Sequence, residues 1–234
     1  MKSQIPVFRS LLHLFFPHIC CGCGSDLLNE DNLFCIYCQA AMPLTCFEFF
    51  PSNPIEKIFW GRVHVQAAAA HLYFTGGSAV QQSLHLLKYK GRKDIGIYFG
   101  LHMGTALERS KRFDDCEIII PLPLYAGREK KRGYNQASLI AEGISKQLKI
   151  PVFSNAIIRI KKTETQTHKS RLQRWKNMED TFKLLDSRQI LNKHILLVDD
   201  VVTTGASLES CALVLQRVQG VKISIACLAH TVSA

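Results

Sequence analysis

The sequence lacks any long hydrophobic run. No apolar stretch approaches the ~20 residues that a membrane-spanning helix needs. The N-terminal apolar cluster at 11–16 is followed by Pro17, His18 and then cysteines, not by the small residues of a secretory cleavage site. Internal repeats and low-complexity segments are also missing. We therefore expect a cytoplasmic protein without membrane insertion.

Acidic side chains are scarce relative to basic ones. Among 234 residues, 29 Lys and Arg stand against 19 Asp and Glu, a formal net charge of +10. With 47% hydrophobic and 21% charged residues, the composition is that of a globular protein and excludes collagen-like, disordered and coiled-coil chains. Residues 1–60 hold three basic and five acidic side chains, a net charge of −2, so the remainder carries +12. This excess suits a nucleic acid, a small phosphorylated molecule or simply a solvated basic surface.

Cysteines, by contrast, are crowded into one region. Six of the nine lie within the first 46 residues, and four of them form two Cys-x-x-Cys pairs separated by eleven residues: Cys20, Cys23, Cys35 and Cys38. Two such pairs complete the tetrahedral sulfur shell that Zn²⁺ favours. The alternative is a disulfide framework, which a reducing cytosol disfavours. We expect a zinc-ribbon-like module at 1–50 that needs its metal to fold and has no open position for catalysis.

Short apolar segments alternate with helical patterns after a turn-rich stretch at 49–54, which we interpret as a linker. The expected strands cover 63–67, 69–74, 117–120, 156–160, 194–198 and 221–228, and the expected helices cover about 78–88, 95–109, 136–148 and 206–218. A polar, basic loop is expected at about 161–177. Apolar strands alternating with helices predict a parallel sheet covered on both faces. We place this α/β domain at 60–234.

One strand runs directly into two acids and a hydroxyl-rich turn. The apolar segment 195–198 precedes Asp199 and Asp200, and the next turn carries Thr203, Thr204, Gly205 and Ser207. Ligands of open α/β sheets bind beyond the carboxyl ends of strands, and a helix N-terminus offers N–H groups to a phosphate. The acids would accept hydrogen bonds from a ribose diol. The alternative is that the acids merely end the strand and a hydroxyl caps the helix, which accounts for one acid or one hydroxyl. A ribose 5-phosphate site accounts for both acids and all three hydroxyls together.

These residues resemble the fingerprint of the type I phosphoribosyltransferases, which use phosphoribosyl pyrophosphate (PRPP). Further segments resemble the ComF family of competence-associated proteins, namely the double Cys-x-x-Cys, Pro121–Leu124, Arg128, Arg132–Gln136, Gln166, Arg174, Asn177 and Phe182. The resemblance spans nearly the whole chain. It implies a type I phosphoribosyltransferase-like parallel sheet flanked by helices, with a small N-terminal zinc-ribbon-like module.

The resemblance also implies roles for particular residues. Asp199 and Asp200 would hold the ribose hydroxyls, and the 5-phosphate would bind at Val202, Thr203, Thr204, Gly205, Ala206 and Ser207. The pyrophosphate would lie at Leu124 and Tyr125, with Arg128 and Arg132 as neutralising cations. The basic loop would close over PRPP through Gln166, Arg174 and Asn177. Mg²⁺ would bridge pyrophosphate and ribose oxygens, and we identify no general base for an acceptor.

Two functions follow from the resemblance and the charge. The first is an enzyme of natural competence and DNA uptake that transfers a phosphoribosyl group from PRPP to an amine-type acceptor. The second is a non-catalytic competence factor that handles single-stranded DNA, uses PRPP as a regulatory ligand and contacts other competence proteins. Trp175 in the basic loop would then stack on a base, unless it packs in the core.

Overall fold

The computed structural model describes residues 18–26, 28, 32–160 and 181–231. Its main sheet has four strands in the order β1-β6-β5-β2, and every neighbouring pair is parallel. The strands are β1 (Ala68–Phe74), β2 (Ile118–Pro121), β5 (His194–Val202) and β6 (Lys222–Thr231). Their apolar residues are buried on both faces, as the continuous hydrophobic runs predict.

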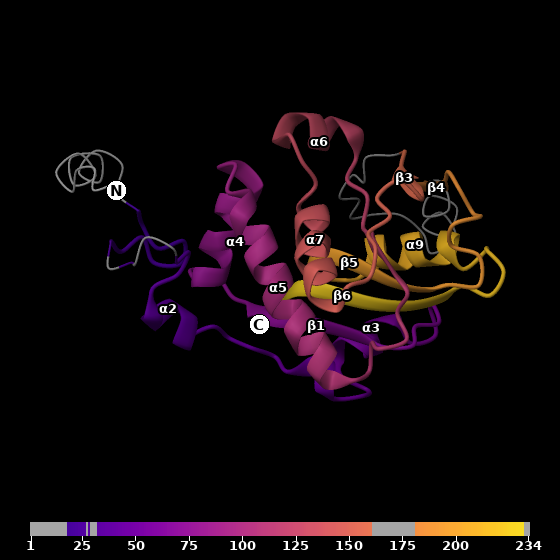
Figure 1. Ribbon diagram of the computed structural model, residues 1–234, viewed down its shortest axis with the longest axis horizontal. Coiled ribbons are helices and arrows are strands. Elements are labelled where there is room, and N and C mark those ends of the chain that lie inside the picture. Colours follow the sequence, from indigo (N-terminus) through magenta and orange to yellow (C-terminus); the bar gives the residue numbers. More distant parts are fainter. Residues whose placement is uncertain (1–17, 27, 29–31, 161–180, 232–234) are drawn as a thin grey trace, which may run out of the picture.

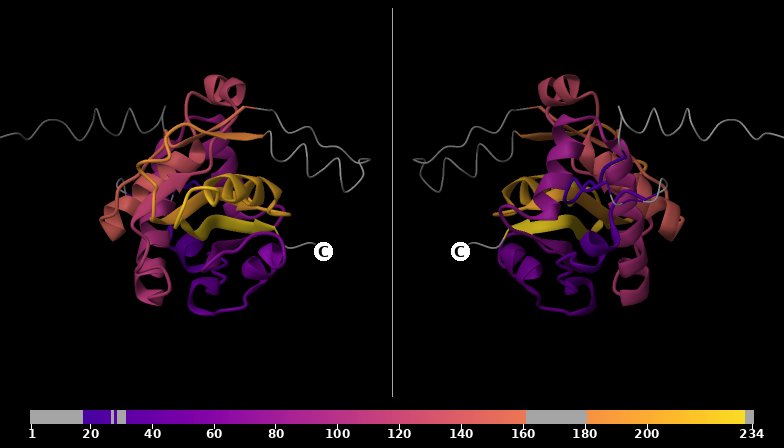
Figure 2. Two further views of the ribbon diagram at one scale, coloured as in Figure 1. Left: turned by 90° about the vertical axis from the view of Figure 1, so that its right-hand side faces the viewer. Right: turned by 90° about the vertical axis from the view of Figure 1, so that its left-hand side faces the viewer.

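Helices lie on both sides of this sheet (Figures 1 and 2). One face packs against α4 (Ala79–Tyr89), α5 (Lys93–Ser110) and α7 (Gln136–Leu148). The other packs against α9 (Ala206–Leu215) and α3 (Pro54–Phe59). Strand residues alternate between the two cores, because successive side chains of a strand point to opposite faces. Thus Leu196 faces α7's side and Leu197 faces α9's side.

A second, two-stranded sheet lies apart from the first. Its antiparallel strands are β3 (Ile157–Arg159) and β4 (Phe182–Leu184). Ile157 and Phe182 belong to the same buried cluster as α9. The expected basic loop at 161–177 connects these strands and lies outside the described residues. Helix α6 (Ala126–Arg132) stands out from the rest of the molecule, at the top of Figures 1 and 2.

The N-terminal segment packs onto the sheet and its helices. The short helices α2 (Ile36–Ala40) and η1 (Phe47–Phe49) precede α3. Between α2 and η1, Leu44 forms an antiparallel bridge with Leu72 at the edge of β1. The stretch interpreted as a linker is therefore folded, and its Asn53 is buried at the start of α3.

Two local predictions were wrong. The segment 63–67 is not a strand, because Val63 N–H bonds back to the Phe59 carbonyl and β1 begins at Ala68. Only the end of the segment bonds to β6, where Gln66 N–H donates to the Ile223 carbonyl. The helix α6 was not predicted at all, since its exposed basic residues have no apolar periodicity. The helix at 136–148 was predicted with its observed bounds, where Asn135 accepts a hydrogen bond from Ala137 N–H. Among the described residues, no helix is both long and apolar enough to cross a membrane.

Candidate functional site

The four cysteines of the double Cys-x-x-Cys motif converge. Their Sγ atoms all lie within 4.8 Å of one another, and the Sγ atoms of Cys23 and Cys35 are 3.8 Å apart. Among the described residues, the cluster consists of Cys20, Cys23, Cys35 and Cys38. Four thiols at this spacing fit the closed tetrahedral shell of a structural Zn²⁺ site. The remaining N-terminal cysteines, Cys21 and Cys46, are outside the cluster, as the spacing predicts.

Backbone N–H groups favour the thiolate form of one cysteine of the cluster, Cys20, whereas burial raises the pKa of Cys38. Gly22 N–H and Cys35 N–H donate to Cys20 Sγ, with N···S distances of 3.4 and 3.3 Å. Burial alone would raise the pKa of Cys20, but these and a further backbone hydrogen bond from Cys23 lower it to about 6. Gly22 also allows a close approach, because a Cβ there would lie 2.8 Å from Cys38 Sγ. The sequence therefore builds the cluster from both side chains and backbone.

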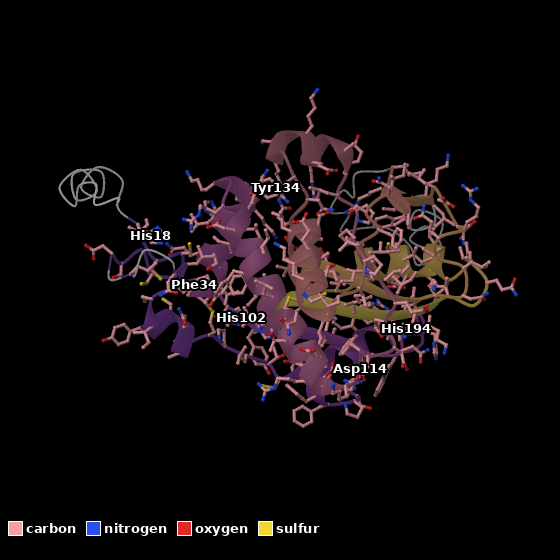
Figure 3. All side chains as sticks on the ribbon, in the orientation of Figure 1. His18, Phe34, His102, Asp114, Tyr134 and His194 are labelled. Atoms are coloured by element: carbon pink, nitrogen blue, oxygen red, sulfur yellow. The ribbon has the colours of Figure 1, made fainter. Side chains whose placement is uncertain are left out.

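Phe34 anchors the cysteine module to the α/β domain. Its ring centroid lies 5.1 Å from that of Tyr98 and 5.4 Å from that of Phe99, both on α5. Figure 3 labels Phe34 where the module meets α4 and α5. The Phe34 side chain is fully buried, so it supplies apolar contact area that a module this small lacks by itself.

The predicted ligand-binding edge of the sheet is formed by β2 and β5. Pro121 at the end of β2 pairs with Val198 of β5, and Leu122 N–H donates to the Val198 carbonyl at 2.7 Å. The next residue of β5 is Asp199, so the loop after β2 and the acidic end of β5 lie at one edge. This loop contains Leu124 and Tyr125, both half-buried. The structure thus brings the two predicted segments together although they are far apart in the sequence.

The two acids at this edge have different surroundings. Asp199 Oδ1 accepts a hydrogen bond from Asp200 N–H at 2.8 Å. Burial, reinforced by the negative charge of Asp200, raises the pKa of Asp199 to about 8. Asp200 instead forms an ion pair with Lys88 of α4, with 2.7 Å between Lys88 Nζ and Asp200 Oδ2. The pair therefore combines a carboxyl that favours the protonated form with a carboxylate held by a cation.

The hydroxyl-rich turn follows β5 and opens α9. Gly205 is the N-terminal cap residue with φ +73°, and no side chain of the described residues caps this helix end. Thr203 and Thr204 are exposed, Ser207 is half-buried, and Val202 and Gly205 are buried. Ala206 is the first helical residue. The turn therefore presents hydroxyls and N–H groups at a helix N-terminus, which suits a phosphate.

Two cations interact with the acids, Lys88 with Asp200 and Arg159 with Asp199, and neither was predicted from the sequence. Of the predicted cations, Arg132 donates from Nη1 to Gln136 Oε1 at 2.6 Å, and its guanidinium lies 5.4 Å from the Tyr89 ring centroid. Arg128 is exposed on α6. Burial and the charge of Arg128 lower the pKa of Arg159, and the charge of Asp199 acts in the opposite direction. Arg159 therefore lies close enough to Arg128 and to Asp199 to interact with the charge of each. With Lys88, it is a functional candidate that the sequence motifs did not identify.

Three predicted site residues cannot be placed by the structure. Gln166, Arg174 and Asn177 lie outside the described residues, as do Arg171 and Trp175. The missed cations had little sequence signal. Lys88 is an ordinary basic residue in the last turn of a helix, and Arg159 is one of several basic residues around the expected loop. Their significance arises from tertiary packing.

The comparisons agree with this geometry. The family model "Phosphoribosyl transferase domain" matches residues 135–233, which include the acids and the hydroxyl-rich turn. The chain is thus a phosphoribosyltransferase-type α/β protein, and the predicted fold class is confirmed. Competence protein F of Haemophilus influenzae is 40% identical over 102 residues, 43% of this chain and 44% of that protein. In sequence and fold, the chain is similar to the ComF family.

Two further matches complete the comparison. DNA utilization protein YhgH of Escherichia coli O157:H7 is 30% identical over 151 residues, which cover 63% of this chain and 66% of that protein. The match therefore spans just under two thirds of YhgH and less than half of Competence protein F. Among solved structures, a hypoxanthine phosphoribosyltransferase from Staphylococcus aureus matches with a TM-score of 0.36 and 13% identity, covering 59% of this chain and 64% of that one.

Proposed function

We propose that this protein binds PRPP at the shared edge of β2 and β5 and transfers its phosphoribosyl group to an acceptor. The observation that carries the proposal is the position of Asp199 and Asp200 between the loop after β2 and the turn that opens α9. In one PRPP molecule, the ribose would lie at the acids, the 5-phosphate at the turn that opens α9, and the pyrophosphate at the loop after β2. The phosphoribosyl transferase domain match at 135–233 supports this.

Each part of PRPP has its own proposed partners. The ribose hydroxyls would donate to Asp199 and Asp200, and the 5-phosphate would bind the turn Val202–Ser207 through hydroxyls and backbone N–H groups. The pyrophosphate would lie at the loop of Leu124 and Tyr125, near Arg128 and Arg132 of α6. Gln166, Arg174 and Asn177 complete the proposed set.

The reaction would displace pyrophosphate from the anomeric carbon. The bond between that carbon and the pyrophosphate oxygen breaks, a bond to the acceptor nucleophile forms, and the acceptor's proton passes to solvent. Mg²⁺ bound with PRPP would neutralise the negative charge that develops on the leaving group. The protein's own contribution is electrostatic, since the Asp200 carboxylate near the ribose favours positive charge on the sugar and the arginines favour the departing anion.

Calorimetric titration tests the binding step. PRPP with Mg²⁺ should bind the wild type, and Asp200→Asn should weaken binding by about tenfold or more, because one charged hydrogen-bond acceptor is lost. Asp114→Asn is the matched control, since Asp114 is exposed and its partner Lys111 is 3.7 Å away on the surface. Equal affinities of Asp200→Asn and wild type would refute the assignment of the acids.

A second experiment separates transfer from binding. Incubation of wild type with PRPP, Mg²⁺ and a panel of amines should release pyrophosphate only with an acceptor, and mass spectrometry should detect the phosphoribosylated product. If PRPP binds but no acceptor leads to release of pyrophosphate, the enzymatic half of the proposal is overturned. The protein would then be a binding protein regulated by PRPP.

The exposed basic helix α6 favours single-stranded DNA as a second candidate ligand. Six of its seven residues are exposed, among them Arg128, Lys130 and Lys131. Two relatives are named for competence and for DNA utilization. Fluorescence anisotropy with a labelled oligonucleotide tests this. One variant reverses the charges of Lys130 and Lys131, and a second reverses those of Arg171 and Arg174. Each should weaken oligonucleotide binding and reduce its salt dependence. An unchanged affinity in both variants would contradict binding of single-stranded DNA.

The cysteine module is proposed to hold one structural Zn²⁺ through Cys20, Cys23, Cys35 and Cys38, within residues 1–50. The phosphoribosyltransferase-like domain would occupy 60–234. We also propose a cytoplasmic location, where the thiols stay reduced, and contacts with other competence proteins. Fractionation followed by thiol labelling of the cell lysate tests both the location and the reduced state.

A further inference from the structure

One helix, α4, connects the cysteine module with the acidic end of β5. Its first half lies under the module, where Ser83 is completely buried. The Ser83 hydroxyl lies 2.6 Å from the Ala79 carbonyl of its own helix and 3.2 Å from the Cys21 carbonyl, and it can donate to either. A helix interior has no free backbone donors on this face, so the hydroxyl provides a direct polar link between α4 and the residue next to Cys20.

Apolar packing reinforces that link. Three residues of α4, Val80, Leu84 and Leu87, belong to the same buried cluster as Cys20 and Cys38. Protein interiors are close-packed, so a shift of the module would be transmitted to the helix. The cysteines that would hold the metal are thus part of the core that positions α4.

The last turn of α4 reaches the proposed PRPP site. Lys88 Nζ is 2.7 Å from Asp200 Oδ2, and their side chains are only 22% and 15% exposed. The carbonyl of the preceding residue, Leu87, accepts a hydrogen bond from the Tyr134 hydroxyl. Figure 3 labels Tyr134 beside α4. Ser83 and Lys88 are five residues apart, a rise of about 7.5 Å along the helix.

We propose that Lys88 is a positioning residue of the phosphoribosyl site and that the cysteine module sets its place through α4, so that metal loading and PRPP binding are coupled. The proposal rests on the PRPP site proposed above. Asp199 and Asp200 are adjacent carboxyls, and the ion pair with the Lys88 ammonium holds the side chain of the second one in one orientation. An oriented carboxylate accepts hydrogen bonds from a ribose diol without first having to be ordered.

The coupling is reciprocal. If the metal-loaded module strengthens PRPP binding by some factor, PRPP must strengthen metal binding by the same factor. Competition with a zinc chelator, followed by its absorbance, measures this without any enzyme activity. We expect PRPP with Mg²⁺ to reduce the amount of Zn²⁺ that the chelator removes from wild type at equilibrium, and to have no such effect on Lys88→Met.

The direct test is a double comparison by calorimetry with the full chain. PRPP affinity is measured for wild type and Lys88→Met, each with and without Zn²⁺. Lys88→Met should weaken binding about tenfold, and removal of Zn²⁺ should weaken binding by wild type but not further weaken binding by the variant. Lys88→Arg should recover part of the affinity. Lys146→Met is the matched control, an exposed lysine in the last turn of α7.

Two further measurements separate positioning from a general loss of structure. Ser83→Ala leaves every metal ligand and every proposed ligand contact in place, so it should retain its Zn²⁺ and still weaken PRPP binding. Lys88→Met should also retain its Zn²⁺ while PRPP binding weakens, since Lys88 pairs with Asp200 and not with the cysteine cluster. A retained PRPP affinity in Ser83→Ala, or a loss of Zn²⁺ from Lys88→Met, contradicts the proposal.

The outcomes distinguish the two proposals. Failure of zinc-loaded wild type to bind PRPP overturns the proposed function and this inference with it. Binding by wild type that is unchanged in Lys88→Met overturns this inference alone. Equal losses on Zn²⁺ removal in wild type and Lys88→Met show that the module does not act through Lys88, which also overturns it.

Discussion

A methyl group placed on Gly205 would lie 2.6 Å from Cγ2 of Ile58. Gly205 caps α9 at the turn proposed to hold the 5-phosphate, and Ile58 lies on α3, which precedes the sheet in the sequence. The same turn is held from outside by Arg62, whose Nη1 lies 3.3 Å from the Thr204 carbonyl and 3.4 Å from Glu209 Oε2. The shape of this turn therefore depends on a segment outside residues 135–233, the range of the domain match.

Gly205→Ala should lower the free energy of unfolding by about 2–4 kcal/mol. About 1–2 kcal/mol comes from a side chain at positive φ, and the rest from forcing a methyl into the packed Ile58 side chain. Urea unfolding measures the total. Gly77→Ala is the matched control, because Gly77 also has φ +73° but no atom of the described residues lies within 4 Å of its added Cβ. Equal losses in both variants would show that contact with Ile58 is unimportant.

Asn53→Asp should be strongly destabilising although it changes no volume. The Asn53 side chain accepts from two N–H groups at the start of α3, and its Nδ2 lies within hydrogen-bond distance of three carbonyls, those of Phe47, Phe50 and Ala68. Aspartate keeps the side-chain oxygen that accepts from the two N–H groups. It replaces the donor Nδ2 with a second oxygen, which then faces buried carbonyl oxygens. We expect a loss of about 3 kcal/mol or more, from unsatisfied buried groups and their repulsion.

The matched control for this variant is Asn135→Asp. Asn135 also begins a helix, but its amide donates to one carbonyl, that of Leu122. Its replacement should cost clearly less, measured by urea unfolding at the same pH. A larger loss at Asn135 than at Asn53 would contradict the role given to the buried Asn53 network.

Cys23→Ser should abolish stoichiometric zinc binding. Elemental analysis should find one Zn²⁺ per wild-type chain and less in the variant, and the melting temperature should fall because the metal stabilises the module. Cys23 is exposed, so the substitution itself removes little packing. Cys46→Ser is the control, an exposed cysteine outside the cluster, and should keep its metal. Full zinc occupancy in Cys23→Ser would disprove the ligand set.

The features predicted correctly from sequence are those encoded over short distances. The double Cys-x-x-Cys brings four sulfurs together because each pair is a single turn, and the helix at 136–148 has its cap residue immediately before it. The acids directly follow the apolar run of β5, close to the end of that strand at Val202, so their place near its carboxyl end follows from local order. These signals need no knowledge of tertiary contacts.

The features missed are those created by packing. Lys88 becomes a site residue only because the last turn of α4 meets β5. The alternation at 63–67 predicts a strand, but the backbone there continues the turn after α3. The stretch at 49–54 has the composition of a linker, yet the Asn53 amide lies within hydrogen-bond distance of three carbonyls, one of them Ala68 of β1, and so holds the stretch against β1. Composition and periodicity do not report such partners.

Asp199→Asn should stabilise the ligand-free protein at high pH relative to low pH. Burial and the neighbouring Asp200 raise the pKa of Asp199 from its ordinary value of 3.8 to about 8. Between these values the folded chain keeps a proton that the unfolded chain releases, so this group's stabilising contribution is present below about pH 4 and is lost as pH rises to about 8. Asparagine does not titrate and escapes this loss.

Urea unfolding of both proteins near pH 5 and near pH 9, without PRPP and Mg²⁺, measures the effect. The stability of Asp199→Asn relative to wild type should increase between the two pH values by at least about 1 kcal/mol, close to the linkage of a single pKa unit. Asp114→Asn, at an exposed carboxylate, should show no comparable change. If the difference between Asp199→Asn and wild type is the same at both pH values, Asp199 is already ionised near pH 5. Both acids would then carry charge when PRPP arrives, and the need for Lys88 as their cation would be greater.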